Sequence, residues 1–231
     1  MKYSKRLYLE QLYPLQDGVM KLVNISRLPF FLTGGTAISR FYFQHRFSDD
    51  LDYFLNDSPD YKRYVQEFEN LLHTSNFEVD ESQTVTSESH HRFIVFRNQV
   101  QLKIDLVNDI AFRVGTFWHD VNFGFIDCWE NILSNKISAI YRFAPKDIAD
   151  IHEICLHKKF SWPEVIDQAR KKDIGISADF VAEIIMDFPI ARMADVIWNK
   201  EYAPDMFQNN LSRIATDILK GADNSLCTQE R

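Results

Sequence analysis

The chain has 231 residues, of which 45% are hydrophobic and 26% charged, and its formal net charge is −7 at pH 7. This is the composition of an ordinary water-soluble protein, long enough for one core or for two closely packed lobes. No stretch comes near the roughly 18 uninterrupted apolar residues that cross a bilayer. The apolar run at residues 7–15 is interrupted by Glu10 and Pro14, so it does not indicate a secretory signal. We therefore expect a cytoplasmic protein without a membrane partner, and the acidic charge argues against a surface that coats nucleic acid broadly.

The first part of the chain has the patterns of both helices and strands. Apolar positions at helical spacing predict a helix over residues 6–25, broken or kinked at Pro14 and Gly18. A short apolar run at residues 30–32 predicts a buried strand that ends in a tight turn. The further expected elements are a helix over 36–44, a strand over 51–55, a helix over 60–73 and strands over 77–80, 92–97 and 100–107.

The second part of the chain has helical periodicity only. Helices are expected over residues 128–143, 146–158, 162–172, 177–187 and 205–220. Strands in one part and helices in the other predict an α+β protein. We expect a lobe over residues 1–127 with a small mixed sheet flanked by helices, and a helical lobe over residues 128–231. The polar tail from about residue 221 is expected to fray.

Two carboxylates lie close together in one expected strand. Asp50 and Asp52 are two residues apart, so their side chains leave the same face, roughly 7 Å apart at Cα. They repel each other unless a cation lies between them, and a hard divalent ion, Mg²⁺ with Mn²⁺ as the alternative, suits oxygen ligands. Asp105 lies on the polar face of the strand over 100–107, beside Lys103. If the two strands are neighbours, Asp105 completes an acidic set able to hold two metal ions, and it is the candidate for a general base.

A glycine turn precedes these carboxylates. Gly34 and Gly35, between a strand and a helix, let backbone N–H groups approach phosphate oxygens without a Cβ in the way. Thr36 adds a hydroxyl at the start of the helix, where the helix dipole favours anions. A Gly-Gly turn or an Asp-x-Asp pair alone is more often a plain turn or a solvated strand edge. Their joint order predicts in-line transfer of a nucleotidyl group from a nucleoside triphosphate (NTP).

The segment LTGGTAISRFYFQHRFSDDLDYF, residues 32–54, resembles the AbiEii/AbiGii toxin branch of the polymerase-β-like nucleotidyltransferase superfamily. A second segment, NKISAIYRFAPKDIADI at residues 135–151, is similar to the branch's helical Lys…Arg…Lys/Arg-Asp-x-x-Asp block. KID at residues 103–105 matches the strand of the third carboxylate. The resemblance covers roughly residues 30–155. In the first segment the matching positions after the glycine turn are His45, Arg46, Ser48, Asp50, Asp52 and Phe54.

The resemblance implies a nucleotidyltransferase-type N-terminal lobe with a helical C-terminal lobe that completes the cleft. It implies that Asp50, Asp52 and Asp105 form the metal-binding and catalytic set. The nucleotide-binding residues that it implies, together with the glycine turn, are Lys136 at the phosphates and Lys146, Asp147 and Asp150 on the opposite wall of the cleft.

Four positions of the two segments have a structural interpretation as well. Arg46 could contact phosphate, or it could pair with Asp49 or Asp50 and hold the loop in shape. For His45 we favour a structural role. Lys146 and Asp150 are four residues apart on one helix face, so they could also form an ordinary exposed ion pair worth about 0.3–0.5 kcal/mol.

The resemblance also implies a biological role, as a toxin of a toxin–antitoxin or phage-defence system that modifies the 3′ end of tRNA. A cognate antitoxin is then an expected partner. The acidic chain lacks a strongly basic surface, so tRNA would rely on a local patch that includes Arg113 and Lys136. Two alternatives stay open: a small-molecule or protein hydroxyl as the acceptor, or a nucleotide-binding module without turnover.

Overall fold

The computed structural model of the chain describes residues 4–75, 77–98 and 100–227. They group into two compact units, one of Met1–Ala37 with Phe47–Cys128 and one of Ile38–Arg46 with Trp129–Arg231. The strands lie in the first unit and helices make up most of the second, so the predicted α+β class is confirmed. The expected division at residue 127 falls next to the end of the first unit. The short segment Ile38–Arg46, expected in the first lobe, belongs to the second unit instead.

The first unit is built on one mixed sheet of eight strands. Their order is β3-β5-β6-β2-β1-β8-β7, and β4 pairs with β5. The second strand, β2, is antiparallel to β1 and parallel to β6. The strands are β1 (Phe31–Thr33), β2 (Leu51–Asn56), β3 (Glu78–Val79), β4 (Val85–Thr86), β5 (His90–Arg97), β6 (Val100–Asp109), β7 (Trp118–Asp120) and β8 (Gly124–Ile126). The strands expected from the sequence are confirmed. The two or three residues of β4, β7 and β8 are too short for a period of two to be recognised.

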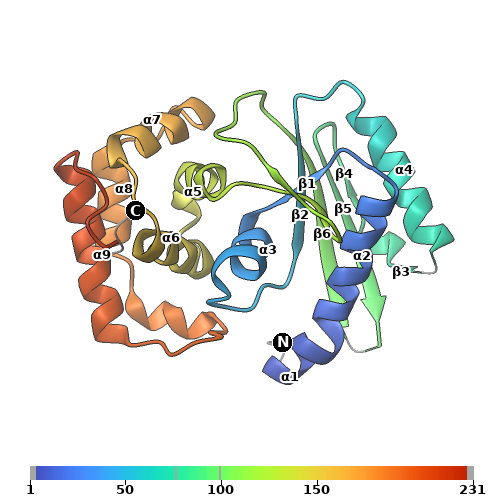
Figure 1. The fold of residues 1–231 in the computed structure, drawn as a ribbon, viewed down its shortest axis with the longest axis horizontal. Helices are drawn as coiled ribbons and strands as arrows, with labels where there is room; N and C mark the ends of the chain where they lie inside the picture. Colours follow the sequence, from blue (N-terminus) through green and yellow to red (C-terminus); the bar gives the residue numbers. More distant parts are fainter. Residues whose placement is uncertain (1–3, 76, 99, 228–231) are drawn as a thin grey trace. The chain divides into compact units, whose positions relative to one another are not determined.

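Two helices, α2 (Tyr13–Ile25) and α4 (Tyr61–Thr74), cover the same face of this sheet (Figure 1). Residues along β2 alternate between buried and half-buried, beginning with buried Leu51. Tyr53 packs on Phe30, which in turn contacts Tyr64 of α4, with ring centroids 6.4 Å apart in both pairs. The odd-numbered residues of β2 therefore face the helices, and Asp52 and Phe54 face the opposite side.

The N-terminal helical region is not broken at Gly18, and that prediction is wrong. Helix α1 (Lys5–Leu7) continues through a π-helical segment, η1 (Tyr8–Leu12), into α2. Pro14 lies in the first turn of α2, where the wider π-helical turn before it accommodates a residue without an N–H. Gly18 lies inside α2 with ordinary helical geometry.

The second unit is a helical assembly in which α8 packs on α9 and α5 packs on α7. Its helices lie close to the expected ranges, and the segment after β1 is helical as predicted.

The remaining helical elements of both units are α3 (Gly34–Ile38), η2 (Ser39–Phe43), η3 (Glu81–Gln83), α5 (Trp129–Ser138), η4 (Ile140–Arg142), α6 (Pro145–His157), α7 (Trp162–Lys172), α8 (Ala178–Met186), η5 (Ile190–Asp195) and α9 (Pro204–Leu219).

The C-terminal segment is anchored as far as Cys227, in contrast to the predicted fraying from residue 221. The side-chain amide of Asn224 donates to the carbonyls of Cys155 and Lys158, both at 2.7 Å. Leu226 and Cys227 are buried. A polar sequence can still be ordered where its side chains bond to the backbone of another element. Within the described part of the chain, no helix is long and apolar enough to cross a membrane.

Candidate active site

The three carboxylates predicted from the sequence are carried by neighbouring strands. Strands β2 and β6 are parallel, and Asp52 lies directly opposite Asp105 in their register. The condition set by the sequence, that these two strands be neighbours, is therefore met. Asp50 lies one position before β2, next to Lys103 of β6, and its carboxylate contacts the Lys103 ammonium at 2.9 Å.

The glycine turn lies directly beside Asp52. Gly34 has φ +67°, a conformation that residues with a Cβ rarely adopt. A Cβ at this position would lie 2.5 Å from Asp52 Oδ2, closer than atoms can approach without a shift. Glycine is therefore required at position 34 for two reasons: the backbone conformation, and the close approach of the Asp52 carboxylate.

The hydroxyl of Thr36 supports the loop that carries the carboxylates. Thr36 is fully buried, and its Oγ1 donates to the backbone carbonyl of Asp50. We expected this hydroxyl to face an anion, but it is occupied within the fold. On the other side of the turn, Thr33 donates to the buried carboxylate of Asp127 at 2.6 Å, and Arg113 donates to the same group at 2.9 Å.

Basic side chains already surround Asp105. Arg92, opposite Asp105 in the β5–β6 register, donates from Nε at 2.8 Å and from Nη2 at 3.1 Å. The ring of His90 lies 2.9 Å away, and Lys103 lies 3.4 Å from the other carboxylate oxygen. Lys103 thus bridges Asp105 and Asp50.

These contacts set the charge states of the group. Burial alone would raise the pKa of Asp105, but the hydrogen bonds from Arg92 and His90 and the charge of Lys103 outweigh burial and lower that pKa. Burial opposes the charged form of Lys103, yet the attraction of Asp50 and Asp105 raises its pKa. Asp105 is thus paired with three basic neighbours, and its role as general base stays a prediction.

The residues fit a magnesium ion that arrives with a triphosphate. Mg²⁺ is usually held by one or two carboxylates together with substrate phosphates, and Asp50 and Asp52 supply two oxygen-donor groups. The absence of a Cβ at Gly34 lets the Asp52 carboxylate lie directly against the glycine turn. No three His, Cys, Asp or Glu side chains of the described residues converge on a closed protein-only metal site.

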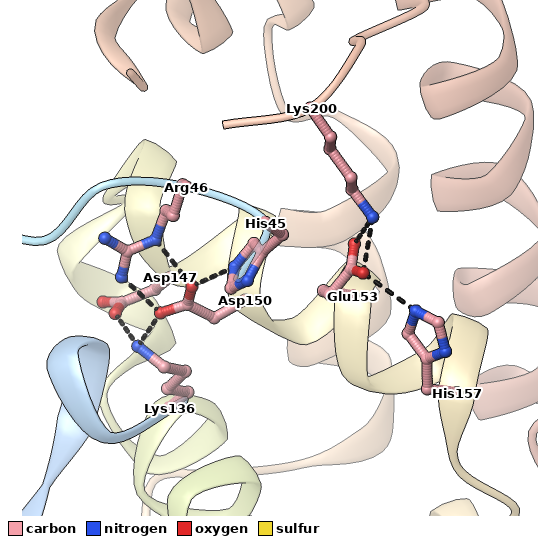
Figure 2. Close-up of polar contacts among 8 residues, drawn as sticks. All are labelled: His45, Arg46, Lys136, Asp147, Asp150, Glu153, His157 and Lys200. Carbon is pink, nitrogen blue, oxygen red and sulfur yellow. Dashed lines mark hydrogen bonds and ion pairs between the residues drawn. The ribbon is translucent and has the colours of Figure 1, made fainter. Parts of the chain in front are cut away.

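The second predicted segment forms a separate ionic cluster inside the helical unit (Figure 2). Its centre is Asp150 of α6, which is completely buried. Arg46 donates to both oxygens of Asp150 at 2.6 Å, and the ring of His45 lies 2.7 Å away. Lys136 of α5 lies 2.6 Å from Asp150 and 2.8 Å from Asp147.

The structure gives Arg46 a partner that was not among the alternatives, the buried carboxylate of Asp150. Its contact with phosphate stays a prediction. The arginine and lysine charges balance the two aspartates, and the guanidinium pairs with the carboxylate in bidentate geometry. The structural role favoured for His45 agrees with its complete burial.

Burial and ion pairing shift the pKa values of the clustered side chains in opposite directions. Burial alone would raise the pKa of Asp150, but Arg46, Lys136 and His45 hold it well below its usual range. Burial would lower the pKa of Lys136, whereas Asp147 and Asp150 raise it. Burial lowers the pKa of His45, and the contact of its Nε2 with Asp150 at 2.7 Å opposes this shift.

Three residues that contact Asp105 or the glycine turn were not predicted from the sequence to do so. Arg92 and His90 were not assigned to Asp105, and Asp127 was not assigned to the glycine turn. A signal for Arg92 was present: the hairpin predicted from the sequence pairs Arg97 with Val100, and counting outward from that pair places Arg92 opposite Asp105. For Asp127 no comparable signal exists, because β8 has only three residues.

With this geometry established, comparison with known proteins identifies the family. Residues 23–211 match the family of nucleotidyl transferase AbiEii toxins of type IV toxin–antitoxin systems, and the chain belongs to this family. A search among curated proteins gave no match.

Similar solved structures include two from Helicobacter pylori. One is a protein provisionally named a nucleotidyltransferase, with a TM-score of 0.60 and 17% identity over 94% of this chain and 96% of that chain. The other is JHP933, with a TM-score of 0.58 and 17% identity over 95% of this chain and 94% of that chain. At this identity the likeness shows a common fold.

Proposed function

We propose that the protein transfers a nucleoside monophosphate from an NTP to a hydroxyl of RNA, in a reaction that requires Mg²⁺. The observation that carries this proposal is the pairing of Asp52 with Asp105 on adjacent parallel strands, beside a glycine that cannot be replaced without a clash. The family of nucleotidyl transferase toxins supports the reaction type. The acceptor follows from the family resemblance and is the less direct part of the proposal.

Each site residue of the first unit has a defined role in the proposed reaction. Asp50 and Asp52 hold the metal ion, and backbone N–H groups at Gly34 and Gly35 bind phosphate oxygens. When bound, the ion neutralises phosphate charge and lowers the pKa of the attacking hydroxyl. Asp105 stays ionised and positions Lys103, which balances the negative charge of the carboxylate group.

The nucleotide roles that the resemblance gives to Arg46, Lys136, Lys146, Asp147 and Asp150 stay predictions. Buried ion pairs of this kind hold elements in register, so a structural role explains most of their contacts. Lys146 is half-buried on α6, and it is the member of the set for which nucleotide binding conflicts least with burial.

The reaction is tested by incubating the protein with Mg²⁺, each labelled NTP in turn and total RNA. Wild type should label RNA, and Asp52→Asn should not, because the carboxylate that holds the ion is lost. Asp109→Asn, at the far end of β6, is the matched control and should behave as wild type. Label on a small-molecule or protein acceptor instead would overturn the RNA assignment. Bound NTP without any transfer would show a binding module.

We also propose that the protein acts as a toxin that a cognate antitoxin counteracts, consistent with the family description. A phage-defence role is one use of such a pair. Induced expression should arrest growth for the wild type but not for Asp52→Asn at equal protein level. Arrest by both would mean that toxicity does not depend on the carboxylates.

A further inference from the structure

The sheet face that carries the carboxylates continues into a row of aromatic side chains. Phe54 lies two residues after Asp52 on β2, so the two side chains leave the same face, roughly 7 Å apart along the strand. Phe31 of β1 lies opposite Phe54, and Phe125 of β8 lies opposite Phe31. His119 of β7 lies opposite Phe125 and completes the row.

The orientation of this row follows from its neighbours. A Cβ at Gly124 would contact Asn24 of α2 at 3.5 Å, so Gly124 faces that helix. Phe125, the next residue, therefore points away from α2. The row lies on the face opposite α2 and α4, the same face as Asp52.

Part of this aromatic surface is in contact with solvent and with a cation. Phe117 stacks on Phe31 with ring centroids 5.6 Å apart and an angle of 18° between the rings. Phe117 is 40% exposed and Phe125 36% exposed, and their centroids are 5.0 Å apart. The guanidinium of Arg113 lies 4.8 Å from the centre of the Phe117 ring and 5.2 Å from that of Phe31.

We propose that the exposed rings of Phe117 and Phe125, packed on buried Phe31 and continued by Phe54 and His119, form a stacking platform for the nucleobases at a single-stranded RNA end. Exposed rings beside an arginine bind bases of any sequence through their flat faces. The proposal rests on the proposed function, because a hydroxyl held at the carboxylates would bring its own nucleotide over the next position of the strands.

A protein partner is the competing occupant of this surface. Strand β7 ends the sheet order, and an edge strand can accept a strand of another chain through its backbone. Such binding would depend on backbone pairing rather than on the rings of Phe117 and Phe125. The two exposed rings and the face that they share with Asp52 favour the nucleobase, and Arg113, paired with Asp127, holds the Phe117 ring in place.

The test measures binding of a fluorescent ten-nucleotide RNA by anisotropy, with EDTA present and no NTP. Phe117→Leu and Phe125→Leu keep apolar volume but remove the flat ring, and each should weaken binding about tenfold. An abasic strand of the same length should bind the wild type about tenfold more weakly than the normal strand. For Phe117→Leu this difference between the strands should shrink. Thermal unfolding of each variant checks that the fold is intact.

Two controls separate this proposal from the function on which it rests. Val121→Ala, 79% exposed in the same β7–β8 hairpin, should leave RNA binding unchanged. Asp52→Asn should lose transfer but keep the tenfold difference between the normal and the abasic strand. Equal binding by wild type and both leucine variants, or no discrimination against the abasic strand, would overturn the platform even if transfer is observed. Ring-dependent binding without any transfer would overturn the proposed reaction and leave the platform standing.

Discussion

Gly34 shows how a single residue type makes the site. Residues with a Cβ rarely adopt its positive φ, and a Cβ at this position would clash with the Asp52 carboxylate. Gly34→Ala should therefore lower stability by about 1 kcal/mol or more and abolish nucleotide transfer, because Asp52 must move. The measurement is urea unfolding together with the transfer assay. Gly18→Ala in α2 is the matched control: it meets only an ordinary contact with Phe77 and should gain about 0.5–1 kcal/mol. Equal effects of the two substitutions would contradict this account.

In the proposed reaction, we expect Lys103 to set the strength of metal binding in the absence of nucleotide. Its ammonium bridges Asp50 and Asp105 and competes with a divalent cation for the same carboxylates. Lys103→Met should bind Mn²⁺ at least about tenfold more tightly than the wild type, a difference of about 1.4 kcal/mol. Electron paramagnetic resonance of free Mn²⁺ measures this directly. Lys103→Arg keeps the charge and should stay near the wild-type affinity; if it gained affinity as the methionine variant does, charge would not be the cause.

At the scale of elements, the buried cluster ties α6 to α5 and to the segment that carries His45 and Arg46. Removing one carboxylate leaves the opposite charges buried without compensation. Asp150→Asn should therefore lower the free energy of unfolding by about 3–5 kcal/mol, measured by urea denaturation. Asp147→Asn should cost less, because that side chain is partly exposed and its partner Lys136 retains Asp150. An Asp150→Asn variant that is fully stable but inactive would instead favour the nucleotide role implied by the family.

The elements also show what a sequence pattern can and cannot specify. Long periodic segments such as residues 60–73 were predicted almost to their ends, because a packed face repeats over several turns. The α+β class was likewise predictable, whereas the adjacency of Asp52 and Asp105 entered only as a condition that the structure meets. The partners of Arg46 were not, because Asp150 lies 104 residues away along the chain. A pairing of that kind depends on tertiary packing, which leaves no local periodicity.

For the whole molecule, one buried histidine couples stability to pH. His152 is buried between α6 and α9, with Asn210 at 3.0 Å and the Phe207 ring 4.2 Å away between centroids. Burial lowers its pKa from 6.5 to about 4. Between pH 6.5 and about pH 4, His152 therefore binds a proton in the unfolded chain but not in the folded chain. The contribution of neutral His152 to the free energy of unfolding is fully present above pH 6.5. It is lost as the pH falls towards 4, by about 3 kcal/mol in total.

Urea unfolding at pH 7 and pH 4.5 tests this coupling. Other groups also titrate in this range, so the comparison is with His152→Gln, whose amide oxygen can accept from Asn210 without titrating. The variant should lose less stability between the two pH values than the wild type. An equal loss in both proteins would show that His152 is not responsible.

The proposed reaction requires a metal ion and a triphosphate to meet at the carboxylates of the first unit. The most direct measurement is a crystal structure with Mn²⁺ and a non-hydrolysable NTP, in which anomalous scattering locates the ion. We predict a manganese peak bound by Asp50 and Asp52, with phosphate oxygens against the backbone of Gly34 and Gly35. A nucleotide bound elsewhere, or an ion that contacts neither aspartate, would contradict the account.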